Sequence, residues 1–172
     1  MRVSRLVMSP WLFLIVPAAL ALLLLVAGQA GLLKSSPPAD LGVRDGRLKP
    51  PSDTENSVTS QASLYPDHPQ RDSAEIAPIS PDDQDADGSR TLARIEKVID
   101  EMAGAVVVET SPGYLRAEFT SKMLKFIDDV EFWLDPPGNV VHVRAAARLG
   151  RSDFGANRRH VEAVRTALAQ DQ

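Results

Sequence analysis

The sequence predicts an α+β domain in which two helices pack on one face of a four-stranded antiparallel sheet, preceded by an N-terminal transmembrane helix. Three observations support this prediction. Residues 114–149 alternate between apolar and polar side chains with a period of two. Segments before and after the strands place apolar residues at helical spacing. The apolar run Pro10–Leu33 is long enough to span a membrane.

The central strands, Tyr114–Thr120, Phe126–Leu134 and Val140–Leu149, each have one apolar and one polar face. One half-buried face per strand is typical of an antiparallel sheet that is covered on one side. The apolar residues are Leu115, Ala117 and Phe119 in the first strand, Val130, Phe132 and Leu134 in the second, and Val141, Val143, Ala145, Ala147 and Leu149 in the third.

The polar faces restrict the register, because residues opposite each other in an antiparallel pair share a face. The DPPGN turn brings Asp129 and Glu131 opposite the polar residues of the third strand. In the first hairpin, pairing Phe119 with Phe126 places Arg116 opposite Asp129. The expected outer face is a lattice of alternating charge. It is interpreted either as a solvated face held by cross-strand pairs or as a binding surface, and its members are Arg116, Glu118, Asp129, Glu131, Arg144 and Arg148.

Asp128 departs from this alternation because it falls on the apolar face. A buried carboxylate needs a partner, so we expect hydrogen bonds from the Gly150–Asn157 loop or from Arg158. A structural role is favoured over that of a catalytic acid. On this interpretation Asp128→Ala destabilises the domain strongly, whereas Asp129→Ala on the outer face has a small effect.

Helices and one further strand flank the three central strands. Apolar residues recur at helical spacing between Ser89 and Gly104, and Ala105–Glu109 predicts a short strand. After the Ser152-Asp153 cap, a last helix buries Val161, Val164 and Leu168. Ala74–Ser80 is a candidate fifth strand at the sheet edge.

Residues 1–33 predict an N-terminal anchor. Arg2 and Arg5 precede the apolar run, which favours a single pass with the N-terminus in the cytoplasm. A cleaved signal peptide, with its cleavage site at Gly28–Ala30, is the alternative. Both place the following domain in the periplasm, and the anchor would hold it at the cell inner membrane.

Residues 34–90 are rich in Pro, Ser and Asp and show no helical or strand period, so composition alone predicts a linker. Within it, 34–40 is the plainest linker. The 34–90 segment also contains the acidic cluster DDQDAD, Asp82–Asp87.

Longer motifs give this segment a different interpretation. At GRLKPPSDTENSVTSQA, YLRAEF, FIDDVEFWLD and VHVRAAARLGRSDFGANRRHVEAVR, the chain resembles the uncharacterised domain of unknown function 1499 family of bacteria and plastids, over about residues 41–168. The resemblance implies one domain over 41–172. In it, 41–80 packs as an extended wrapping segment, 81–90 is an insertion and 91–172 is the core. It implies no established activity.

The resemblance implies cysteines at two positions where this chain has Pro51 and Ser57. If those cysteines form a disulfide, this chain folds without it. If they form a redox or metal site, this chain lacks that site. A short local disulfide is the favoured interpretation.

The chemistry of the sequence favours a non-catalytic module over an enzyme. The chain has no cysteine, and His68, His142 and His160 have no metal-site spacing, so no metal or cofactor is expected. Charge is near balance, with 19 basic and 23 acidic residues, which argues against a nucleic-acid partner.

Three functions therefore stay open: binding of an anionic lipid, glycan or protein through the Arg-rich C-terminal part, service as an accessory subunit of a membrane-protein complex, and, less favoured, an enzyme with a site around Asp128 and the 150–159 loop. The candidate binding or structural residues are Arg116, Asp128, Asp129, Glu131, Arg144, Arg148, Asp153, Asn157, Arg158 and Arg159.

Overall fold

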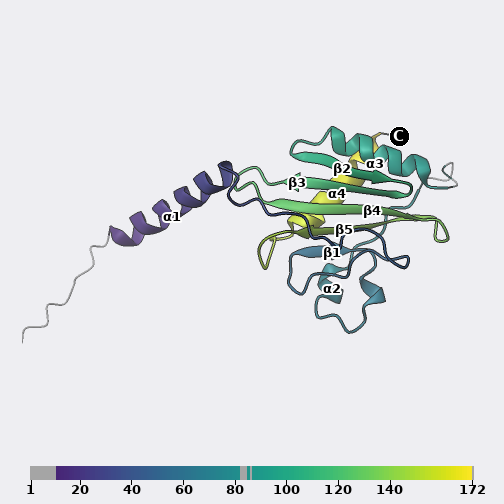
Figure 1. Cartoon of the computed structure of the whole chain (residues 1–172), viewed down its shortest axis with the longest axis horizontal. Helices are drawn as coiled ribbons and strands as arrows, with labels where there is room; N and C mark the ends of the chain where they lie inside the picture. Colours follow the sequence, from purple (N-terminus) through teal and green to yellow (C-terminus); the bar gives the residue numbers. More distant parts are fainter. Residues whose placement is uncertain (1–10, 82–84, 86, 172) are drawn as a thin grey trace, which may run out of the picture.

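A computed structural model describes residues 11–81, 85 and 87–171. Its centre is a five-stranded antiparallel sheet with the strand order β1-β5-β4-β3-β2 (Figure 1). The predicted α+β class is confirmed. The fifth strand comes from residues 57–59, whereas 74–80 makes only isolated bridges at Glu75 and Ile79. The strands are β1 Ser57–Thr59, β2 Ala105–Ser111, β3 Tyr114–Thr120, β4 Ile127–Asp135 and β5 Val140–Ala147.

Two of the helices cover the apolar face of the sheet (Figure 1). They are α3, Ser89–Asp100, and α4, Ala156–Gln170, as the helical spacing predicted. A 3-10 turn, Ala62–Leu64, and a one-turn helix α2, Arg71–Ala74, lie beside β1. The core between the sheet and the helices is formed by residues such as Ile95, Ile99, Leu115, Val130, Phe132, Val143, Val161 and Val164, which are fully or almost fully buried.

One of the two predicted registers is correct. In the β4–β5 hairpin, Asp129 lies opposite Ala146 and Glu131 opposite Arg144, as the strand faces required. In the β3–β4 hairpin the prediction was wrong by two residues, since Phe119 lies opposite Asp128. The cause is the loop: Ser121 N–H donates to the carbonyl of Phe126 at 2.8 Å, so Phe126 closes the turn and the strand begins one residue later.

The polar face of the sheet is also covered, contrary to the interpretation as a solvated face. Asp129, Glu131 and Arg144 are 2%, 0% and 3% exposed. Residues 34–80, which we call the wrap, pass over this face, form the edge strand β1 and then reach the edge of α4 (Figure 1). The wrap is therefore part of the folded domain, including the 34–40 stretch that composition assigned to a linker.

The segment between the wrap and α3 contains a helix cap. Asp85 is 2% exposed, and its carboxylate accepts hydrogen bonds from the backbone N–H groups of Arg90 and Thr91 at 3.2 and 2.6 Å. These bonds satisfy amides of the first turn of α3 that have no partner within the helix. The remaining residues of the predicted acidic insertion, 82–84 and 86, lie outside the described part of the chain.

The N-terminal prediction is corrected by helix α1, Leu12–Gln29, which leaves the end of the sheet (Figure 1). No helix among the described residues is long and apolar enough to cross a membrane, so the predicted transmembrane helix is not found. The predicted span of 24 residues is shortened because the helix ends at Gln29, and its 18 residues cover about 27 Å, less than a hydrocarbon core of ~30 Å. Arg2 and Arg5, on which the predicted orientation depends, lie outside the described residues.

Candidate binding site

A network of charged side chains lies between the sheet and the wrap. Its first centre is Glu131 on β4, which accepts hydrogen bonds from the Tyr114 hydroxyl at 3.0 Å and from the Gly42 backbone N–H at 2.7 Å. Arg144 on β5 reaches the same carboxylate with Nη1 at 3.4 Å. Because Gly42 belongs to the wrap, Glu131 ties it to the middle of the sheet.

The second centre of the network is Asp129, two residues earlier on β4. Arg148 donates to both of its carboxylate oxygens at 2.7 Å, and Arg116 donates to it at 3.1 Å. Arg148 also pairs with Glu118 and donates to the carbonyl of Ser35 at 2.9 Å. These contacts place Asp129 between two guanidinium groups under the first residues of the wrap.

Burial and charge shift the pKa values of the network in opposite directions. Burial lowers the pKa of Arg144, and the neighbouring Glu131 carboxylate opposes that shift. The hydrogen bond to Asp129 raises the pKa of Arg148. Burial raises the pKa of Tyr114, and the charge of Glu131 raises it further, so this hydroxyl stays protonated and donates. Arg144 is thus the cation that is least well compensated.

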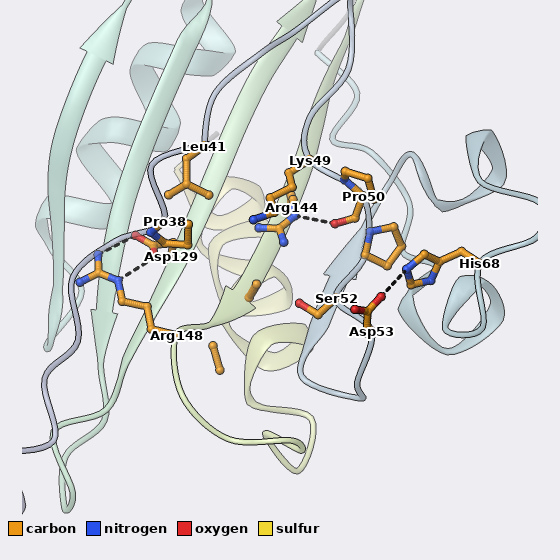
Figure 2. Close-up of a pocket in the computed structure, with 13 residues that line it drawn as sticks. Pro38, Leu41, Lys49, Pro50, Ser52, Asp53, His68, Asp129, Arg144 and Arg148 are labelled. Carbon is orange, nitrogen blue, oxygen red and sulfur yellow. Dashed lines mark hydrogen bonds and ion pairs between the residues drawn. The ribbon is translucent and has the colours of Figure 1, made fainter.

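A cleft of about 470 Å³ opens beside the network, between the wrap and the end of β5 (Figure 2). The space exists because Ala146, on the polar face of β5, projects only a methyl group where a longer side chain would fill it. Asp129, Arg144, Ala146 and Ala147 come from the sheet and Arg148 directly follows β5, whereas the other lining residues come from the wrap. Those wrap residues are Pro38, Leu41, Lys49, Pro50, Pro51, Ser52, Asp53 and His68.

Arg144 lies on the wall of this cleft with part of its donor capacity unused. Its Nε donates to the carbonyl of Pro50 at 3.2 Å and its Nη1 to Glu131, as Figure 2 shows for the Pro50 contact. No described residue accepts a hydrogen bond from Nη2. A guanidinium has five N–H donors, so an anion in the cleft would find donors available there.

The wrap side of the cleft carries Lys49 and His68. Lys49 Nζ lies 2.7 Å from Asp40, which holds the pKa of that carboxyl below its usual value. His68 Nδ1 accepts a hydrogen bond from the Gln70 backbone N–H at 3.1 Å, so the Nε2 atom carries the proton and faces Asp53 at 3.7 Å.

The loop that closes this end of the cleft includes Pro51 and Ser57, the positions at which the family resemblance implied cysteines. Ser57 Oγ accepts a hydrogen bond from the Ser52 backbone N–H at 2.8 Å. This bond links the two ends of the 52–57 loop, and Pro51 lies on the cleft wall beside it. A hydrogen bond therefore closes the loop in a chain without cysteine.

The predicted Arg-rich C-terminal surface is not one surface. Arg144 and Arg148 lie on the polar face of the sheet, whereas Arg158 and Arg165 lie on α4 at the edge of the wrap. All four donate to backbone carbonyls of the wrap. The acceptors are Pro50 for Arg144, Ser35 for Arg148, Ser73 and Glu75 for Arg158, and Ala77 and Pro78 for Arg165.

The predicted pairing of Asp128 with Arg158 was wrong. Asp128 is buried on the core face, and its carboxylate lies 3.1 Å from Nε2 of His160, two residues after Arg158 in α4. His160 also contacts the ring of Phe119, with the ring centroids 4.6 Å apart. Asp128 thus holds α4 to the sheet through a histidine, while Arg158 points toward residues 73–75.

The remaining predicted site residues have structural contacts. Asp153 accepts hydrogen bonds from the N–H groups of Gly155 and Asn157 at the start of α4. The buried Asn157 donates to the carbonyl of Asn56 at 3.0 Å, and Arg159 donates to that of Phe154 at 2.8 Å. In the described part of the chain, no group of three His, Asp or Glu side chains could hold a metal ion.

Sequence reasoning found the sheet side of the site and missed the wrap side. Arg144, Arg148 and Asp129 follow from strand alternation, whereas Lys49, Ser52 and His68 lie in a stretch without a period. The available signal was the family motif itself, since its first part covers residues 46–62.

This fold and this motif define an uncharacterised class of α+β domain. The family model described as "Protein of unknown function (DUF1499)" matches residues 47–168, and the chain belongs to that family. The match takes in most of the wrap together with the core. Comparison with curated proteins and with solved structures found no match for either.

Proposed function

We propose that the domain is a non-catalytic binding module whose cleft holds a small organic anion. The observation that carries this proposal is Arg144, a buried cation on the cleft wall with Nη2 donors that no described residue accepts. A carboxylate would complete those hydrogen bonds and would offset the cost of burying the guanidinium.

The shape and lining of the cleft support an organic ligand rather than a bare inorganic ion. Its volume of about 470 Å³ lies within the range of ~300–1,000 Å³ that is typical of small-molecule sites. Six of the lining residues are prolines, leucine or alanines, so an apolar body can pack there. Specificity would then come from a few polar groups, chiefly Arg144, Lys49 and Ser52.

The charges around the cleft favour a negative ligand. Among the lining cations, Lys49 is paired with Asp40 and Arg148 with Asp129 and Glu118, whereas Arg144 keeps Nη2 donors that no described residue accepts. Asp129 is already held by Arg148 and Arg116, so it offers little to a cationic ligand. An anion is therefore the better match to the side chains that remain available.

Calorimetric titration with succinate and with benzoate tests the proposal, because the two probes share a carboxylate and differ in their bodies. Lys49→Met should weaken binding several-fold by removing a cation from the cleft. Lys97→Met is the matched control, because Lys97 forms the same kind of exposed pair, with Asp171 at 2.7 Å.

A second variant tests the space. Ala146→Val adds two methyl groups to the wall of the cleft and suits a β-strand. It should reduce carboxylate binding while the far-UV circular dichroism spectrum stays unchanged. Native mass spectrometry of the freshly purified protein adds a search for a co-purified ligand. Equal titrations for all variants, together with no bound mass, would contradict the proposal.

A second candidate function is that of an accessory subunit of a membrane-protein complex, and helix α1 favours it. Ten large apolar side chains between residues 11 and 26 are exposed, Trp11 and Phe13 by more than 60%. Such a surface is stable in water only when a partner covers it. Removing residues 1–30 should then abolish stoichiometric co-purification with a membrane protein, whereas loss of cleft binding alone would leave it intact.

We also propose that the domain works in the periplasm, on the basis of Arg2 and Arg5 ahead of the apolar run. A C-terminal alkaline phosphatase fusion should be active in intact cells. An inactive fusion that is made in normal amounts would contradict this location.

A further inference from the structure

A second hollow lies on the far side of Lys49 and Pro50, at the first turn of the wrap. It has a volume of about 300 Å³, and its walls include Arg44, Arg47, Lys49 and Tyr65. From it we propose a phosphate site: Arg44 and Arg47 together bind a phosphate dianion, as inorganic phosphate or as a phosphomonoester. The hollow shares Lys49 and Pro50 with the organic-anion cleft, but Arg44 and Arg47 do not line that cleft, so the phosphate proposal does not depend on it.

The backbone places the two arginines side by side. Arg44 and Arg47 form an antiparallel bridge with both hydrogen bonds made, Arg44 N–H to Arg47 O at 2.9 Å and Arg47 N–H to Arg44 O at 3.0 Å. The turn residues between them, Asp45 and Gly46, have φ values of 51° and 68°, which suits a two-residue hairpin turn. Opposite residues of such a pair project their side chains to the same side, with Cβ atoms about 5 Å apart.

Two like charges in this arrangement repel each other unless an anion lies between them. Both arginines are exposed, and no described carboxylate forms an ion pair with either of them. Asp40, on the same wall, is engaged with Lys49 at 2.7 Å. Asp45 also lines the hollow and would repel the ligand, so it limits the affinity.

The hairpin is held firmly enough to keep this geometry without a ligand. Gln61 donates to the Gly46 carbonyl at 3.3 Å and accepts from the Leu48 N–H at 2.8 Å. The Tyr65 hydroxyl donates to the Leu48 carbonyl at 3.1 Å, and the Gly42 N–H donates to Glu131. The backbone that carries the two arginines therefore needs no large rearrangement to bind an anion.

The charge balance favours a dianion. A singly charged anion neutralises one of the two guanidinium groups, whereas a phosphate or phosphomonoester dianion neutralises both and offers three oxygens to planar N–H forks. Lys49 also lines the hollow, but its charge is paired with Asp40 at 2.7 Å, so Arg44 and Arg47 are the cations that a dianion would neutralise.

Titration of the full chain with inorganic phosphate, glycerol 3-phosphate and dimethyl phosphate at pH 8, followed by NMR of the backbone amides, tests the site. Shifts should centre on residues 44–47. The double variant Arg44→Gln with Arg47→Gln should lose at least about tenfold in phosphate affinity, and each single variant several-fold. Asp45→Asn should bind more tightly than the natural chain.

Arg151→Gln is the matched control, since Arg151 is another exposed arginine without an ion pair among the described residues, and it should bind phosphate normally. Tighter binding of glycerol 3-phosphate than of phosphate would assign the natural ligand to the phosphomonoesters, and the reverse order to free phosphate. The proposal is overturned if the double variant binds phosphate as tightly as the natural chain, if dimethyl phosphate binds equally well, or if no saturable binding occurs. Ala146→Val should leave phosphate binding unchanged, so failure at one site is distinguishable from failure at the other.

Discussion

The core, residues 89–171, and the wrap, residues 34–80, bury their side chains in different ways. In the core, α3 and α4 pack apolar residues such as Ile95 and Val164 against the sheet. The wrap has few such residues, and much of its contact with the core is made by side chains that donate to its backbone carbonyls. Apolar burial tolerates small shifts, whereas hydrogen bonds to buried charges do not. The contact between the wrap and the core is therefore more polar than the contact between the two helices and the sheet, and it depends more strictly on geometry.

This comparison has a functional consequence. The cleft and the Arg44–Arg47 hollow are both formed mainly by wrap residues over a rigid sheet. Many combinations of apolar residues can form a core of this kind. The loops of the wrap, by contrast, can carry polar, charged or apolar side chains without changing the core. We therefore expect binding to depend on the wrap and overall stability to depend on the core and the charge network beneath it.

The largest expected effect is at the contact between the two regions. Asp129 is almost fully buried between Arg148 and Arg116, so Asp129→Ala leaves two cations without their carboxylate and should cost about 3–5 kcal/mol. Asp128→Ala should cost less, because its partner His160 is 28% exposed. Urea denaturation of both variants measures the difference. This order is the reverse of what strand alternation predicted, and a larger loss for Asp128→Ala would restore the earlier interpretation.

A smaller effect is expected where α4 holds the wrap. Replacing Arg158 and Arg165 by Met removes hydrogen bonds to four carbonyls between residues 73 and 78 and should cost about 1 kcal/mol for each arginine, since these bonds are partly exposed. Hydrogen exchange should rise at Ile76 and Ile79, whose N–H groups bond to Thr59 and Val141. Amides of β3 should keep their protection, and an equal rise in both places would show that the wrap and core unfold together.

At the cleft, Ser57→Ala tests the bond that closes the 52–57 loop. The substitution removes the acceptor of the Ser52 N–H and should cost about 1 kcal/mol. Ser73→Ala is a suitable control, because its hydroxyl makes only local, exposed bonds to Gln70. Thermal denaturation of the two variants gives the comparison. Equal melting temperatures would mean that water replaces the Ser57 bond without loss.

The sequence predicted the core more fully than the wrap for physical reasons. Strand alternation determines faces, so it identified the polar residues that form the charge network, and the short turn at 135–139 determined the register of β4 with β5. The loop at 121–126 is longer, and its internal hydrogen bond moved the other register by two residues. Alternation also cannot tell whether water or another segment covers a polar face.

The wrap escaped prediction from local pattern because carbonyl acceptors are present at every residue. The local sequence does not distinguish an arginine that donates to the carbonyl of Pro50 or Ser73 from one that faces solvent. The arginines of the C-terminal part were therefore predicted to form an anion-binding surface, although several of them donate to the wrap. The family motif was the signal that the wrap belongs to the domain. The partner of Asp128 was missed because the helix phase was not resolved: Arg158 and His160 are two residues apart in α4 and point in different directions, and only His160 faces Asp128.

The smallest expected effect concerns His142, which lies on β5 where the wrap crosses it. Burial lowers the pKa of His142 below its ordinary value of 6.5, and Asp135 opposes that shift. Its Nδ1 lies 3.0 Å from Ser60 Oγ of the wrap, and its ring stacks on Trp133. As the pH falls below 6.5, the unfolded chain takes up a proton at this residue before the folded one does, so stability falls with acidification. This stabilising contribution is fully present above pH 6.5 and is lost as the pH falls to the lowered pKa of His142 in the folded protein.

His142→Gln should therefore flatten the dependence of the unfolding free energy on pH between 7.5 and 5.5, measured by urea denaturation at several pH values. Carboxylate protonation contributes equally to both proteins in this range and cancels in the difference. Parallel curves for the two proteins would show that His142 reaches solvent and that the wrap is open over this end of the sheet.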